Sequence, residues 1–173
     1  MQVIDVIKGR RSIREYSNEE VSDDTVRMLI DAARWAPSAG NLQPWDFIIV
    51  RLNQQKKRLV KAAYNQQFIA EAPTVIVACA NPIRSSSRYG LRGSSLYCLL
   101  DTAFAVQNII LTAHSLGLGT CVIGAFDENQ VKKILNLPDD IRPVVIIPVG
   151  HPAQEPKPPI RRDLNEIIHY MKF

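Results

Sequence analysis

The segment that most constrains the fold of this chain is the apolar stretch from Leu96 to Leu116. A helical spacing is followed by Leu100, Ala103, Phe104, Gln107, Ile110, Leu111 and His114. Apolar residues also occupy positions between them, at Val106 and Ile109. A helix that is apolar almost all round must be covered on more than one side. The pattern therefore predicts a central, buried helix with a surface suited to a subunit interface.

The strands are few. The continuous apolar run from Thr74 to Ala80 is typical of a strand that is covered on both faces. Further strands are predicted at 47–50 and 144–149, and helices at 3–8, from Ser22 onward, at 54–63 (polar, on the surface) and at 127–135. This irregular order predicts an α+β fold, not alternating βαβ units, in a single domain spanning residues 1–173.

Composition excludes several classes of protein. The three cysteines, Cys79, Cys98 and Cys121, contain no Cys-x-x-Cys pair, and no histidines have metal-ligand spacing, so neither a disulfide framework nor a metal site is indicated. No apolar run approaches the ~20 residues that span a bilayer, and the N-terminus lacks signal-peptide features, so a cytoplasmic location is predicted. The net charge of +4 is modest, and aromatic residues do not alternate with basic ones as in a nucleic-acid platform.

A basic cluster follows the first helix: Arg10, Arg11, Ser12, Ile13 and Arg14. Arginine offers a planar fork of donors that matches phosphate oxygens, and a neighbouring serine adds a hydroxyl donor. One interpretation is a phosphate clamp. The other is a solvated basic turn at a helix C-terminus, where cations are favoured in any case.

Two later stretches are rich in amides and hydroxyls. The loop from Ala36 to Trp45 carries Ser38, Asn41 and Gln43, which could bind a planar heterocycle, while Trp45 itself suits a core anchor. A second amide cluster lies at 64–68. Gly124 and Ala125 follow a glycine-rich segment whose order, helix then glycines then strand, excludes a dinucleotide fingerprint but leaves bare backbone for a flat ligand.

The segment from Asn81 to Ser95 combines serines and glycines with Arg84, Arg88 and Arg92. A flexible composition of this length predicts a mobile lid or inserted loop, or else a disordered surface excursion. Its three arginines suit an anionic acceptor or the 2′-phosphate of NADPH.

Five of these motifs, taken in order, resemble the FMN-dependent nitroreductase family: 10–14, 36–45, Gln107-Asn108, 117–120 and 123–126. The resemblance covers nearly the whole chain. It implies a central mixed or antiparallel sheet flanked by helices and an intertwined homodimer with two FMN molecules at its interface. It also implies that the proline-rich tail, residues 152–173, wraps the partner subunit.

The resemblance also implies a role for each site residue. Arg10 and Ser12 would hold the FMN phosphate with Arg161, or Arg162 in the alternative register, and Arg11 would serve through its backbone. Arg14 would lie by the pyrimidine edge of the flavin. The flavin ring would be contacted by the partner's Pro37, Ser38, Ala39 and Asn41. The ribityl chain or the ring edge would be reached by Asn65 or Gln66. Flavin N5 would be contacted by the backbone of Gly124 and Ala125.

The function implied is that of an oxidoreductase in which the flavin carries the chemistry. Hydride would arrive at N5 from NADH or NADPH, and two electrons would pass to a small acceptor, such as a nitroaromatic or a quinone, by a ping-pong mechanism. Two alternatives remain open. One is a specialised member that fragments flavin, dehalogenates or dehydrogenates its substrate; the other is a flavin-binding sensor without turnover.

Overall fold

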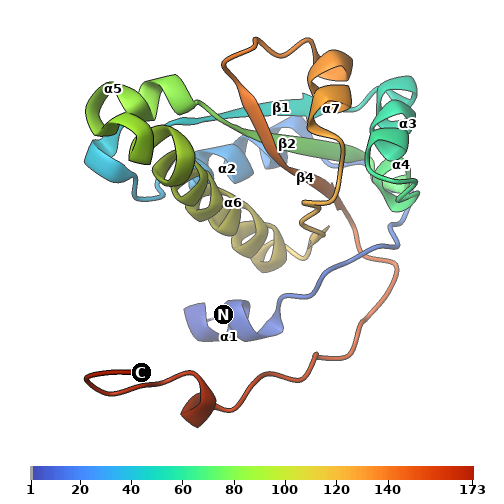
Figure 1. Ribbon diagram of the computed structural model, residues 1–173. Coiled ribbons are helices and arrows are strands. Elements are labelled where there is room, and N and C mark those ends of the chain that lie inside the picture. Colours follow the sequence, from blue (N-terminus) through green and yellow to red (C-terminus); the bar gives the residue numbers. More distant parts are fainter. Residues whose placement is uncertain (1) are drawn as a thin grey trace.

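The computed structural model describes residues 2–173 and shows one antiparallel sheet with helices on both faces (Figure 1). The four strands have the order β1-β2-β4-β3. They are β1 (Trp45–Val50), β2 (Thr74–Ala80), β3 (Gly119–Thr120) and β4 (Arg142–Gly150). All three strand pairs are antiparallel, and a short parallel bridge joins Ser12 to Thr120 beyond them. The predicted α+β class is confirmed.

Two hydrophobic cores lie on opposite faces of the sheet. Against one face pack α2 (Asp23–Arg34) and α6 (Cys98–Ser115), and against the other pack α3 (Asn53–Ala62), α4 (Phe68–Glu71) and α7 (Glu128–Leu135). Strand β2 is buried at every residue, as its apolar run predicts. Trp45 anchors the first core.

Helix α6 is the central helix that the sequence predicts. It buries eight residues against α2 and the sheet, including Ala105, Ile109 and Ala113. Leu100 and Phe104 are left 44% and 47% exposed on its outer side. The continuous helical run from Pro82 to Ser115 is long and apolar enough to cross a membrane by length and composition alone, but its α6 part is a core helix of this domain.

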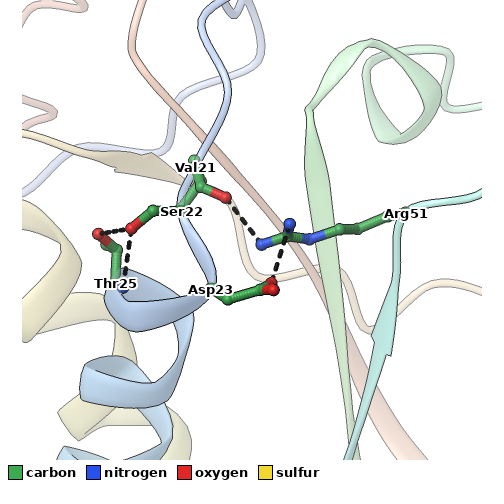
Figure 2. Close-up of polar contacts among 5 residues, drawn as sticks. All are labelled: Val21, Ser22, Asp23, Thr25 and Arg51. Carbon is green, nitrogen blue, oxygen red and sulfur yellow. Dashed lines mark hydrogen bonds and ion pairs between the residues drawn. The ribbon is translucent and has the colours of Figure 1, made fainter.

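Helix α2 begins with the predicted serine cap (Figure 2). The Ser22 hydroxyl accepts a hydrogen bond from the Thr25 N–H at 3.1 Å, which satisfies one of the free donors of the first turn. Arg51, directly after β1, donates to the Val21 carbonyl at 2.7 Å and pairs with Asp23 at 3.0 Å. These contacts fix the helix start against the end of the edge strand.

The prediction that 81–95 is an inserted loop or a disordered excursion is wrong, and the alternative role as a mobile lid stays a prediction. This segment forms α5 (Pro82–Arg92), followed by a wide helical turn (Gly93–Tyr97) that leads into α6. The Asn81 side chain caps the helix by accepting from the Arg84 N–H at 2.9 Å, and proline suits its first turn. The hydroxyls of Ser86 and Ser87 bond back to carbonyls one turn earlier, so residues typical of loops are accommodated within a helix.

The polar segment 54–63 forms the predicted surface helix, and one face of this helix is buried. Helix α3 buries Lys56, Leu59 and Val60 against the second core. Lys56 extends its aliphatic stem through this packing, and its Nζ donates to the Ala72 carbonyl at 2.6 Å.

Both ends of the chain stand apart from the packed layers (Figure 1). Helix α1 (Val3–Gly9) buries none of its residues, although Val3, Ile4 and Ile7 are apolar. Beyond β4 the tail is extended except for a short turn (Leu164–Glu166), and it carries large apolar side chains that are almost fully exposed, among them Ile160, Tyr170 and Phe173. Within one chain these apolar surfaces are left uncovered.

Candidate functional site

The arginine-serine segment 10–14 is fastened along the edge of the sheet. The N–H of Arg10 donates to the Val6 carbonyl at the end of α1, and the N–H of Ile13 donates to the Thr120 carbonyl at 2.9 Å. Ser12 forms the parallel bridge to Thr120, and the Ile13 side chain is buried. Alternate side chains therefore point in opposite directions, with Ile13 toward the core and its neighbours toward solvent.

Arg10, Ser12 and Arg14 share one side of this segment, around the thiol of Cys121. Burial raises the pKa of Cys121, while the neighbouring Arg14, Ser12 and Arg10 act in the opposite direction. Within residues 2–173, no carboxylate lies within 4.0 Å of Arg10 or Arg14. The cluster therefore presents two positive charges and a hydroxyl without an internal counterion.

Arg11 is used differently. Its Nη1 donates to the carbonyls of Lys8 at 2.6 Å and Arg10 at 2.8 Å, so that it caps the C-terminus of α1. This agrees with the expectation that only its backbone would face a ligand, and that backbone role stays a prediction.

The second amide cluster lies beside this segment. The Gln66 side chain donates to the Ala125 carbonyl at 3.2 Å and to the Ala63 carbonyl at 3.1 Å, and Asn65 adopts a left-handed conformation with φ of 65°. The guanidinium of Arg14 lies 5.9 Å from the centre of the Phe68 ring at the start of α4. The structure thus brings the arginine cluster, residues 65–68 and Ala125 to one end of the sheet.

Gly124 and Ala125 present open backbone there. Both are exposed, and a Cβ added to Gly124 would meet no atom within 4 Å. Unpaired arginines beside uncovered backbone fit a ligand with an anionic group and a flat ring, so these residues fit FMN. The cavity of about 490 Å³ beneath the tail is lined by Arg11 and His114, whereas Arg10, Ser12 and Arg14 are not part of its lining.

The loop with Pro37, Ser38, Ala39 and Asn41 lies elsewhere. It follows α2 and sits beside α5, at the opposite end of the sheet from α4 (Figure 1). The Ser38 hydroxyl accepts from the Gln43 N–H at 3.0 Å, and Gly40 and Asn41 adopt left-handed conformations. One chain therefore does not bring this loop together with the arginine cluster.

Asp101, which the sequence analysis missed, positions that loop. It is only 4% exposed, and its two carboxylate oxygens lie 3.2 Å from the Ala39 N–H that donates to them. Burial raises the pKa of Asp101, and the Ala39 N–H acts in the opposite direction. The available signal was a single acidic residue within an otherwise apolar helix.

Arg161 and Arg162 lie on the exposed tail. Arg162 pairs with Glu166 at 3.3 Å and also donates to its carbonyl at 3.0 Å. For Arg161, no carboxylate lies within 4.0 Å in the described part of the chain. Among residues 2–173, no group of three His, Cys, Asp or Glu side chains is placed to hold a metal ion.

The fold defines the class of the protein first: it is an α+β protein with the architecture of known flavin-linked oxidoreductases. It superimposes on an NADPH:FMN oxidoreductase from Vibrio harveyi complexed with NAD+, with a TM-score of 0.91 and 26% identity, covering 99% of this chain and 77% of that one. The family model described as "Nitroreductase family" matches residues 7–69 and 52–151. The chain belongs to the nitroreductase family.

Relatives from other organisms carry reductase names. A protein of Methanothermobacter thermautotrophicus, provisionally named NADH dehydrogenase/NAD(P)H nitroreductase, is 34% identical over 90% of this chain and 80% of its own length. The oxygen-insensitive NADPH nitroreductase of Salmonella typhimurium is 31% identical over 98% of this chain and 74% of its own. The residues that the family model matches include the arginine segment.

Proposed function

We propose that this protein is an FMN-dependent oxidoreductase that takes electrons from NADH or NADPH and passes them, two at a time, to a small acceptor such as a nitroaromatic or a quinone. The observation that carries the proposal is the cluster of Arg10, Ser12 and Arg14, which has no counterion within 4.0 Å among residues 2–173 and adjoins the open backbone of Gly124 and Ala125. Family membership and the names of the relatives support it.

The roles of the residues follow from their chemistry. Arg10 and Ser12 hold the phosphate through charge-assisted and hydroxyl hydrogen bonds. Arg14 offers a fixed positive charge to the ring, which favours the more negative, reduced form. Gln66 orients the peptide of Ala125 through its hydrogen bond to the carbonyl, and the N–H groups of this turn stay free to face the ring.

When bound, FMN supplies the redox chemistry: it accepts a hydride equivalent from the nicotinamide and returns two electrons to the acceptor. We expect ping-pong kinetics, because donor and acceptor then occupy one site in turn. The protein contributes binding, orientation and electrostatics, with no side-chain nucleophile.

The proposal includes a homodimer. Within one chain, the loop at 37–41 and the arginine cluster lie at opposite ends of the sheet (Figure 1). They can therefore share a flavin ring only across a subunit interface. A partner would also cover the exposed apolar surfaces of α1, of Leu100 and Phe104 on α6, and of the tail. In such a dimer the tail wraps the partner, and Arg161, which has no carboxylate within 4.0 Å among residues 2–173, joins the phosphate site.

The test is a flavin-binding and turnover assay on the purified, full-length protein. The protein is expected to hold FMN through a desalting column, to be bleached by NADH or NADPH without oxygen, and to be reoxidised by a quinone. A protein that binds FMN but shows no turnover with any donor would be a sensor and would contradict the enzymatic part. A cytoplasmic location, where NAD(P)H is available, belongs to the same proposal.

A further inference from the structure

Helix α5 presents an uncompensated row of positive charge. Between residues 72 and 100 the charged side chains are Arg84, Arg88 and Arg92, with no acid among them. Arg84 and Arg88 are four residues apart, which places them on one face of the helix. Arg92 follows a break in the helical geometry at Gly90, where φ is 54°, and all three arginines are exposed. Like charges at this spacing repel one another, so an anion bound against this face would relieve the repulsion.

The structure connects this row to the loop at 37–41. Arg84 donates to the Gln43 carbonyl at 3.0 Å. A Cβ on Gly40 would lie 2.7 Å from Nη1 of Arg88 and 2.7 Å from the hydroxyl of Tyr89. A guanidinium and a phenol therefore rest on the backbone of the loop, at a left-handed residue that leaves them room.

The three arginines differ in how far they are engaged. Arg92 donates to the Tyr97 hydroxyl at 3.0 Å and lies over its ring. The guanidinium carbon of Arg88 lies over the Tyr89 ring, 5.6 Å from its centre, and Arg88 forms no ion pair within residues 2–173. This cation–π contact restrains the side chain, and its charge has no counterion among those residues, which suits the binding of an oxyanion.

We propose that Arg88, assisted by Tyr89 and Arg84, binds an anionic phosphate or carboxylate group of the substrate that reacts over the loop at 37–41. This inference rests on the proposed function, because it is the flavin that brings a substrate to this loop. Two sources share the chemistry: the 2′-phosphate of NADPH, or an acidic group on the electron acceptor. Either way, the site selects substrates by charge without taking part in electron transfer.

The test compares FMN-loaded wild type with Arg88→Gln and with Arg58→Gln, an equal charge change on the exposed side of α3. One arm measures KM for NADPH and NADH with a neutral quinone. The other measures KM for nitrobenzoate and nitrobenzamide with NADH as donor. If the site binds NADPH or nitrobenzoate, Arg88→Gln should raise KM for that substrate about tenfold with kcat nearly unchanged. KM for its counterpart without the anionic group, NADH or nitrobenzamide, should be unaffected.

The outcomes separate the claims. Loss of discrimination in the cofactor arm identifies the 2′-phosphate, and loss in the acceptor arm identifies an acidic acceptor. If Arg88→Gln matches Arg58→Gln in both arms while the flavin is bound and NADH is oxidised, the anion site is refuted and the proposed function stands. If the wild type retains no flavin absorbance, both the proposed function and the inference that rests on it are refuted.

Discussion

The backbone N–H of Ile13 donates to the Thr120 carbonyl at 2.9 Å, and the Ile13 side chain covers the Cα of Gly119, next to Thr120. This contact fastens the arginine segment to β3. The positions of Arg10, Ser12 and Arg14 therefore depend on a strand more than a hundred residues later in the chain.

Gly119→Ala should disturb the site through this contact. The new Cβ would lie 2.8 Å from three Ile13 atoms, so the segment must shift. We expect a loss of about 1–3 kcal/mol in the free energy of unfolding, as for overpacking elsewhere, together with weaker FMN binding. Thermal denaturation and a fluorescence titration with FMN measure the two effects. Gly124→Ala is the control for stability, because its Cβ would meet no atom within 4 Å, and an equal loss in both variants would contradict the account.

Arg10→Ala and Arg14→Ala should differ in kind. Removing Arg10, the proposed phosphate ligand, should weaken FMN binding at least tenfold, whereas Arg14→Ala should retain FMN but slow its reduction by NAD(P)H. Equilibrium titration and anaerobic stopped-flow reduction separate the two effects, with Arg27→Ala on the exposed face of α2 as the charge control. Equal loss of FMN in both arginine variants would refute the division of roles.

Asp101 predicts a pH dependence of stability. Its pKa is raised in the folded state, so the folded protein binds more protons than the unfolded chain between the ordinary value near 3.8 and the raised one. Stability conferred by the neutral carboxyl is therefore present at lower pH and is lost as the pH rises through that window. Asp101→Asn keeps an acceptor for Ala39 and should remove this slope.

Asp101→Leu is the companion variant, because it leaves the buried Ala39 N–H without an acceptor. It should cost about 1–3 kcal/mol, measured by urea unfolding at neutral pH. If the free energy of unfolding changes with pH to the same extent in wild type and in Asp101→Asn, titration of the buried carboxyl does not cause the predicted pH dependence.

The two tail arginines should not be equivalent. Arg162 is already paired with Glu166, whereas Arg161 has no carboxylate within 4.0 Å in residues 2–173. Arg161→Ala should therefore weaken FMN binding more than Arg162→Ala does, measured by the same titration. A larger loss of FMN binding in Arg162→Ala would indicate that Arg162, not Arg161, contacts the phosphate.

Phe104 tests the dimer. It is 47% exposed on the outer side of α6, and Phe104→Glu should place a charge within the proposed interface and yield monomers without FMN. Sedimentation velocity measures the oligomeric state. Leu52→Glu, at an exposed apolar position before α3, is the matched control and should stay dimeric.

Much of the fold could be predicted because its signals are local. The all-apolar run of β2, the serine cap of α2 and the Asp127 cap of α7 each act within a few residues. Helix α5 was not predicted because serine and glycine favour loops in general. The close packing of its turns is visible only in the contact between Gly93 and Ser85.

The candidate site was only partly predictable for a related reason. Arg10, Ser12 and Gln66 were identified by residue type and by resemblance, but the contact between Gln66 and Ala125 joins positions 59 residues apart. Asp101 was missed because an acid on a helix is usually solvated. Its role depends on the approach of Ala39 from another element, which no local pattern reveals.

The central claim, that unpaired arginines at the sheet edge hold FMN, is tested most directly by the visible absorbance spectrum of the purified protein after incubation with FMN and desalting. The account predicts flavin bands that persist through the column, are lost on addition of NAD(P)H without oxygen, and disappear from Arg10→Ala before reduction. A colourless wild-type protein, or an Arg10→Ala variant that retains as much flavin as the wild type, would contradict it.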